Sequence, residues 1–113
     1  MKLKTFFLAV LLASGMAQAQ SFSEKQVYDY RVNMAQAGEL LKQNQSQQAF
    51  AKILPFAQQG FAEAQYVLAT MYHDGEGVAQ DLAQAKHWYT LAAQQQDNQA
   101  VADLAREGLS DLP

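Results

Sequence analysis

The stretch from Gly60 to Ala100, GFAEAQYVLATMYHDGEGVAQDLAQAKHWYTLAAQQQDNQA, decides the fold of this chain. On each side of a short glycine segment, apolar residues recur three or four positions apart, which is typical of amphipathic helices. The two apolar stripes consist of Ala64, Leu68, Met71 and Tyr72, and of Ala85, Trp88, Tyr89, Ala92 and Ala93. The sequence therefore predicts an antiparallel pair of helices, over about residues 61–72 and 82–95.

The segment between these two predicted helices has the features of a tight reversal. Gly75 and Gly77 supply positions where a positive φ angle or a close backbone approach is tolerated, so the first helix can end and the chain can turn. Asp81 suits an N-cap, and Gln84 lies at the spacing of a capping box. Small alanines on both stripes allow the helices to approach closely.

The same residues resemble the Sel1-like repeat, a relative of the tetratricopeptide repeat. The resemblance extends over about 40 residues, and it implies an α/α hairpin without naming a ligand. Ala69 departs from the pattern, since the family usually has glycine there. The positions that carry the resemblance are Ala64, Leu68, Ala69, Tyr72, Gly75, Gly77, Val78, Asp81, Ala85, Trp88, Tyr89, Ala92 and Ala93.

The preceding segment is a degenerate copy of this unit. A shift of 36 residues aligns Ala49, Ile53, Ala57 and Ala64 with Ala85, Tyr89, Ala93 and Ala100. Such an internal repeat is the signature of a solenoid. We therefore predict an all-α solenoid of antiparallel hairpins. Its parts are a degenerate first repeat (24–60), a Sel1-like repeat (61–96), and a capping helix with a short tail (97–113).

Several local signals refine the expected helix ends. Capping boxes are expected at Ser21 with Glu24 or at Ser23 with Gln26, and at Asn44 with Gln47. Helices are then expected over about 24–42 and 47–59, with a kink at Pro55 or a break just before it. The last helix should be capped by Asp97 or Asn98 and should end at Gly108.

The N-terminus has the pattern of a secretory signal peptide. A short basic start is followed by the apolar run Phe6–Ala13 and by Ala17-Gln18-Ala19, an A-x-A cleavage site. The apolar run is too short to span a bilayer, which needs roughly 20 residues. We expect cleavage after Ala19, a short lead-in over 20–23, and a periplasmic or secreted protein without stable membrane insertion.

The composition excludes several classes of function. After cleavage, six basic residues face eleven acidic ones, a formal charge of −5. Nucleic acids and anionic membrane surfaces both attract basic patches, so neither is an expected partner. The chain has no cysteine, which removes disulfides, thiol catalysis and thiolate metal sites.

The remaining chemical motifs are weak, so we expect no catalytic site, no metal and no cofactor. His73 and His87 lack the spacing and the carboxylate of a zinc site. The segment Gly75–Val78 follows a predicted helix and carries acidic neighbours, unlike a phosphate-binding loop. No twelve-residue calcium loop is present. Trp88 and Tyr89 lie on the apolar stripe and are expected in the core.

Tetratricopeptide geometry implies a concave face lined by the first helix of each pair. Each residue placed there by this comparison could instead be an ordinary solvated helix position. Exposed tyrosine and methionine in a shared groove favour protein binding. The candidate groove consists of Tyr30, Arg31, Met34, Glu63, Tyr66, Thr70, His73, Asp103 and Arg106.

The leading functional hypothesis is a non-catalytic module that binds a partner protein or peptide, as an adaptor, host-interaction or immunity protein. The first alternative is a β-lactam-binding or β-lactam-hydrolysing enzyme, like cysteine-rich secreted relatives of the family. This chain lacks their cysteines and has no Ser-x-x-Lys motif. The second alternative is a structural repeat that associates with itself, because two hairpins and a cap fall short of the three repeats that such arrays usually need.

Overall fold

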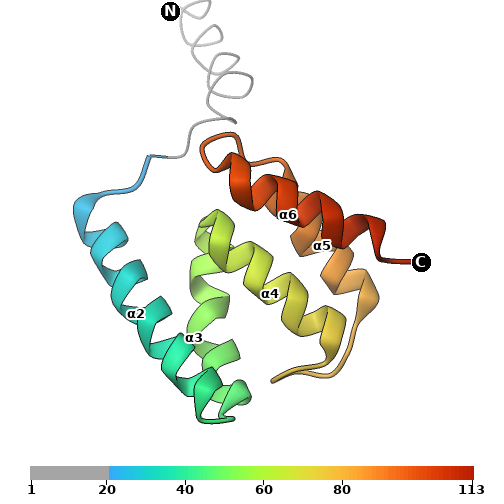
Figure 1. Cartoon of the computed structure of the whole chain (residues 1–113). Helices are drawn as coiled ribbons and strands as arrows, with labels where there is room; N and C mark the ends of the chain where they lie inside the picture. The colour runs from blue at the N-terminus through green and yellow to red at the C-terminus, as the bar shows by residue number, and fades with distance from the viewer. Residues whose placement is uncertain (1–20) are drawn as a thin grey trace, which may run out of the picture.

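A computed structural model describes residues 21–113 of the chain, so the expected signal peptide lies outside the described residues. The described part contains five helices and no strand, and this confirms the all-α fold class (Figure 1). The helices are α2 (Glu24–Lys42), α3 (Ser46–Gln59), α4 (Ala62–Asp74), α5 (Leu82–Ala93) and α6 (Gln99–Ser110).

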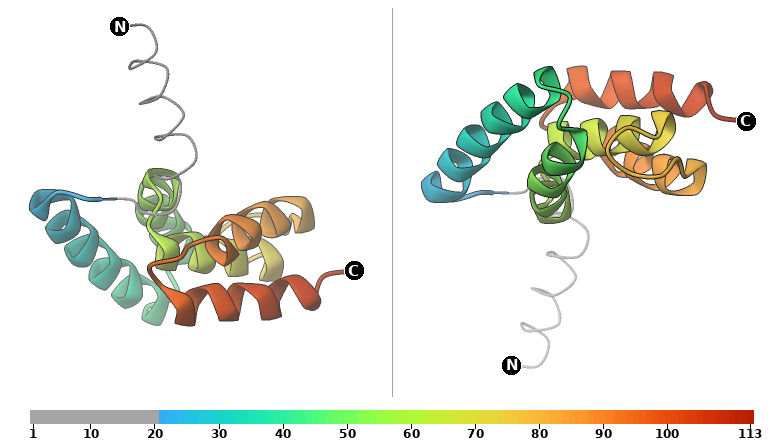
Figure 2. Two further views of the ribbon diagram at one scale, coloured as in Figure 1. Left: turned by 90° about the horizontal axis from the view of Figure 1, so that it is seen from above. Right: turned by 90° about the horizontal axis from the view of Figure 1, so that it is seen from below.

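The helices pack in chain order, each against the next. In addition, α4 packs against α6, so α4, α5 and α6 form a three-helix unit. In both views of Figure 2, α2 lies at the edge of the molecule opposite the C-terminus. The main neighbour of α2 is α3, as expected for the first helix of a solenoid.

Two apolar clusters form the core. The first lies between α2, α3 and α4, where Ile53 and Leu68 are fully buried. The second lies between α4, α5 and α6, where Tyr89 is surrounded by alanines. Because alanine has only a methyl group, these helices can approach closely and still exclude water. The fully buried or nearly fully buried alanines are Ala37, Ala49, Ala57, Ala64, Ala69, Ala85, Ala92, Ala102 and Ala105.

Three aromatic rings form a stack that joins the N-terminal lead-in to the first repeat. Phe61 stacks on Phe22 at 3.9 Å between ring centroids and on Tyr30 at 4.1 Å, with interplanar angles of 12° and 4°. Phe56 meets both Phe61 and Tyr30 edge-on. The lead-in therefore belongs to the core packing of the first repeat, although the periodicity of the sequence assigned it to neither helix.

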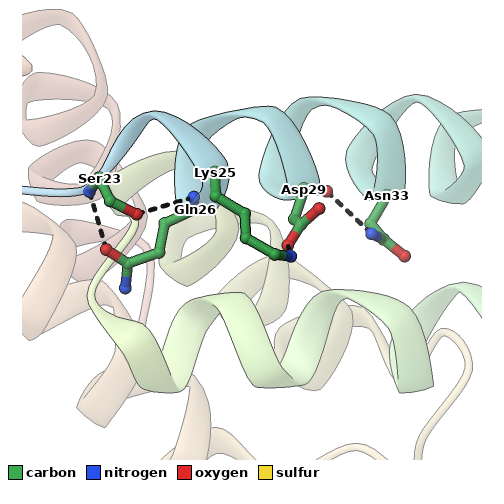
Figure 3. A network of polar contacts seen from close by, with 5 residues as sticks. All are labelled: Ser23, Lys25, Gln26, Asp29 and Asn33. Carbon is green, nitrogen blue, oxygen red and sulfur yellow. Dashed lines mark hydrogen bonds and ion pairs between the residues drawn. The ribbon is translucent and has the colours of Figure 1, made fainter.

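The predicted caps are confirmed at three helix starts. Ser23 and Gln26 form a complete capping box at α2, with contacts of 3.1 and 2.8 Å (Figure 3). The side chain of Asp81 accepts a hydrogen bond from the backbone N–H of Gln84 at α5. Asn98, one of the two expected candidates, caps α6 in the same way. Each such cap satisfies backbone donors that the helix itself leaves free.

Both glycines of the predicted reversal have positive φ angles, as expected. Gly75 ends α4 at φ 69°, and Gly77 follows at φ 77°. A Cβ atom on Gly77 would lie 2.4 Å from the backbone oxygen of Ser46. Gly77 is therefore required for its backbone angle and also for its close approach to the start of α3.

One expectation in the first repeat is wrong, and another is narrowed. The capping box at Asn44 does not form, because Asn44 adopts a left-handed conformation at φ 60° and α3 begins after Gln45 without a side-chain cap. Of the two outcomes expected at Pro55, the break does not occur, because the helix continues through this residue, and the kink stays a prediction. Pro55 is exposed. On that face, water can bond to the carbonyl that the proline ring leaves without a partner.

The expected end of the last helix at Gly108 is also wrong, since α6 continues to Ser110. Gly108 instead lies under the ring of Tyr89, where an added Cβ would be 2.5 Å from two ring carbons. The glycine therefore serves the packing of α5 against α6 rather than the termination of a helix.

Candidate partner-binding cavity

A cavity of about 460 Å³ lies between the N-terminal half of α2, the α3–α4 turn and the α5–α6 connection. We call it the interhelical cavity. Aromatic, acidic, basic and amide side chains line it together, with no strong excess of one charge. The lining residues are Val27, Tyr30, Arg31, Gly60, Phe61, Ala62, Glu63, Gln95, Asp97 and Asn98.

Hydrogen bonds between glutamines fix the wall formed by the α5–α6 connection. The amide nitrogen of Gln95 donates to the carbonyl of Gly60 at 2.9 Å and to the side-chain oxygen of Gln65 at 3.1 Å. Gln65 is only 4% exposed, and its own amide donates to the carbonyl of Ala57 at 3.3 Å. A buried polar group that is satisfied in this way has few alternative positions. The cavity is therefore held open by a fixed wall.

Tyr30 contributes a hydroxyl group that stays neutral. Burial, with a smaller contribution from the negative charge of Glu63, raises the pKa of Tyr30 well above its ordinary value of 10. Neither Glu63 nor Asp97 forms an ion pair within the described residues, and the same holds for Arg31. Among residues 21–113, the cavity thus presents two carboxylates and one guanidinium group without an ion-pair partner, together with a phenol donor.

The comparisons with known proteins bear on the hairpin beside this cavity. A scan against protein families finds the Sel1 repeat over residues 62–97, which covers α4, the glycine segment and α5. Residues 62–97 are a Sel1 repeat. Sel1 repeats generally mediate protein–protein interactions and are typically non-catalytic. No curated protein and no solved structure matches the chain.

The nine candidate groove residues do not all line one cavity. Tyr30, Arg31 and Glu63 line the interhelical cavity. Arg106 lines a second cavity of about 690 Å³, whose other walls are Ala93, the glutamines 94–96 and Gln99. Gln95 lines both cavities.

The other candidates of α2, α4 and α6 make local contacts. Met34 packs against the first core cluster. The hydroxyl of Thr70 donates to the carbonyl of Val67 at 2.6 Å. Asp103 and Arg106 form an exposed ion pair at 2.7 Å, and Arg106 also donates to the carbonyl of Ala93. These contacts are typical of helix surfaces and of packing, and they do not by themselves indicate a binding site.

Tyr66 and His73 both contact Tyr89 inside the Sel1 repeat. The ring of Tyr66 lies 5.9 Å from that of Tyr89, and Nδ1 of His73 lies 3.1 Å from the Tyr89 hydroxyl. Burial, with smaller contributions from Tyr66, Asp74 and Asp111, raises the pKa of Tyr89 to about 12. These side chains therefore hold α4 against α5, which leaves them less free to contact a partner.

This elevated pKa predicts a loss of stability at alkaline pH. The unfolded chain releases the phenol proton at a pH of about 10. The stabilising contribution of protonated Tyr89 is therefore complete below about pH 10 and is lost as the pH rises through about 12. In urea unfolding at about pH 9 and pH 11.5, Tyr89→Phe should lose less stability than the wild type. Tyr28→Phe, which alters an exposed ring, should behave like the wild type. Equal losses in wild type and Tyr89→Phe would contradict the assignment.

The sequence pattern missed the part of the cavity that lies in the α5–α6 connection. The sequence offers Asp97 and Asn98 only as cap candidates and gives no local signal for Gln95, although all three line the cavity. The cap at Asn98 was the available signal, because it predicts where α6 begins and hence where the connection ends. The contact of Gln95 with Gly60, 35 positions away, left no local signal.

The described residues offer little for metal or nucleophilic chemistry. No group of three metal-ligating side chains occurs in residues 21–113. Within the same range, no helix is both long and apolar enough to cross a membrane. The hydroxyls of Ser23 and Ser110 bond to neighbouring backbone, and that of Ser46 lies 3.5 Å from the carboxylate of Glu76. A serine nucleophile needs a base that accepts its proton; Ser23 and Ser110 contact none here, and Ser46 contacts a carboxylate only at the long distance of 3.5 Å.

Proposed function

We propose that this chain is an exported, non-catalytic module that binds a segment of a partner protein in the interhelical cavity. The general role of Sel1 repeats in protein–protein interaction supports the class of function. The signal-peptide pattern of residues 1–19 supports export to the periplasm or to the outside of the cell.

The observation that carries the proposal is the composition of the cavity wall. An extended protein segment presents alternating N–H donors and carbonyl acceptors. The cavity offers acceptors at Glu63 and Asp97, which have no ion-pair partner within the described residues, and donors at Arg31. Tyr30 adds an aromatic edge and a neutral hydroxyl group. The wall is mainly polar, with Val27 and Phe61 in its apolar part, and this suits a segment that presents backbone hydrogen-bonding groups.

The proposal is tested by capture of a partner from the extracytoplasmic fraction of the native cell. The wild-type protein should retain a stoichiometric partner, and Glu63→Ala and Asp97→Ala should each weaken that complex about tenfold or more, because each removes a hydrogen-bond acceptor from the wall. Glu107→Ala is the matched control, since Glu107 is an exposed acidic residue of α6 outside the cavity. The first residue of the exported protein should be Gln20.

Two results would contradict this function. One is a partner whose affinity is the same for the wild type and for both cavity variants, with unchanged far-UV circular dichroism. The other is a protein recovered from the cytoplasm that still begins with Met1. The first would remove the cavity from the proposal, and the second would remove export.

A further inference from the structure

One face of α2 has no neighbour within the described residues. α2 packs along α3, and its inward side chains belong to the first core cluster. The opposite face carries Tyr28, which is 68% exposed, and Val32, which is 37% exposed. Both figures of the whole chain show this helix at the outer edge of the molecule (Figures 1 and 2).

The apolar side chains of this face gather around a shallow hollow. Its volume is about 340 Å³, and its walls are almost entirely apolar. Val27 and Tyr28 line it although neither belongs to a core cluster. We call this surface, with Val32, the α2 face; the hollow itself is lined by Phe22, Glu24, Val27, Tyr28 and Arg31.

The position of the α2 face at the end of the array explains why it is open. In a solenoid each unit buries its apolar faces against the units on both sides, and terminal units need a polar outer face. α4 is an inner helix, and it packs on both sides, against α3 and against α5 and α6. Within the described residues, the main neighbouring helix of α2 is α3, and the outer face of α2 carries an exposed tyrosine and valine among its charged residues.

The α2 face carries an acidic residue before Tyr28 and a basic residue after it. Lys25 and Asp29 neutralise each other in an ion pair of 2.8 Å (Figure 3). Glu24 lies four residues before Tyr28 and Arg31 lies three residues after it, and neither has an ion-pair partner within the described residues. On a helix these spacings place both charges on the same side as Tyr28.

We propose that the α2 face binds the α2 face of a second copy of this chain, with the two helices antiparallel and crossing at Tyr28. A two-fold interface brings the same patch of both subunits together, so every contact occurs twice. In this arrangement Glu24 of each copy lies opposite Arg31 of the other, and the two Tyr28 rings pack against each other at the crossing point.

The second copy fits this surface better than a strongly charged partner or a membrane. The face holds one acid, Glu24, and one base, Arg31, without ion-pair partners among the described residues. These two residues lie opposite each other only when the α2 helices of the two copies are antiparallel. A membrane surface would require a group of basic residues, and the chain is acidic after the expected cleavage. The apolar contacts would supply the affinity, and the exposed charge pairs would set the orientation.

Sedimentation equilibrium of the purified protein, with its first residue established by sequencing, tests the proposal. The wild type should show a monomer–dimer equilibrium, and Tyr28→Ala should raise the dissociation constant at least tenfold. Glu24→Arg and Arg31→Glu should each weaken the dimer several-fold, because like charges then face each other. The double variant should recover most of the wild-type affinity. Leu104→Ala, which truncates an exposed leucine of α6, is the matched control and should leave it unchanged.

The chain contains no cysteine, so a single introduced thiol can report the geometry independently. Tyr28→Cys should be cross-linked to itself by a short bis-maleimide, and Leu104→Cys should not. A wild type that remains monomeric up to about millimolar concentration would overturn the proposal, and so would a dimer unaffected by Tyr28→Ala. Because Tyr28→Ala and Glu24→Arg leave the cavity residues Arg31, Glu63 and Asp97 intact, failure here is distinguishable from failure of the partner-binding cavity.

Discussion

Replacing Phe61 with alanine should lower the free energy of unfolding by about 3–5 kcal/mol, the range for truncation of a buried aromatic ring. Phe61 is 7% exposed and has a ring on each face, Phe22 and Tyr30. The variant would lose the transfer free energy of the ring, and it would also leave a cavity between three segments that cannot all close around a methyl group. Urea unfolding followed by circular dichroism measures the loss.

The size of the loss in unfolding free energy shows whether Phe61 packs in the core or only acts locally at the start of α4. Phe61→Leu should cost clearly less than Phe61→Ala, since leucine fills part of the space but cannot stack. Leu104→Ala provides the control, because Leu104 is 43% exposed and its truncation should cost less than about 1 kcal/mol. A loss below 1 kcal/mol for Phe61→Ala would show that the three-ring stack does not hold the lead-in and α2 against the repeat.

The apolar stripes of α4 and α5 could be predicted from the sequence, whereas the ring stack around Phe61 could not. Periodicity identified α4 and α5 because each helix repeats its own apolar spacing along the chain. The stack of Phe22 on Phe61 joins residues 39 positions apart, outside any helix, and has no period. Such a contact is visible only once the hairpins are assembled.

Local signals failed where a tertiary contact or solvent decided the outcome. Gly108 resembles a helix terminator, but the ring of Tyr89 needs the space that its missing side chain leaves. Pro55 resembles a helix breaker, but it lies on the exposed face of α3, and buried neighbours on the other face hold the helix together. In both places the packing of the opposite face outweighs the propensity of a single residue.

The candidate site residues also fall into two groups, those that repeat geometry predicts correctly and those that a tertiary contact engages. Tyr30, Arg31 and Glu63 were predictable because they lie on the first helices of successive hairpins, where repeat geometry places the concave face. Tyr66 and His73 occupy similar positions, yet Tyr89 engages both. Repeat geometry therefore predicts the face on which a residue lies, whereas the size of the neighbouring side chains decides whether that residue remains available.

Replacing Gly77 with alanine should destabilise the protein by about 2–5 kcal/mol. A left-handed backbone costs a residue with a Cβ atom roughly 1–2 kcal/mol, and Gly77 has φ 77°. The new Cβ would also lie 2.4 Å from the backbone oxygen of Ser46. Because that oxygen belongs to the first turn of α3, relief requires a shift of the helix, and overpacking of this kind typically costs a further 1–3 kcal/mol.

Two other glycines separate these contributions. Gly75 has φ 69°, but its nearest contact would be a side-chain carbon of Gln80 at 3.2 Å, so Gly75→Ala should show mainly the backbone cost. Gly38 lies inside α2 with open space around it, and Gly38→Ala should stabilise the protein by up to about 1 kcal/mol. If Gly77→Ala and Gly75→Ala cost the same in urea unfolding, the close approach to α3 contributes nothing. If Gly77→Ala costs more, the excess measures how firmly the glycine segment of the Sel1 repeat is seated against the first repeat.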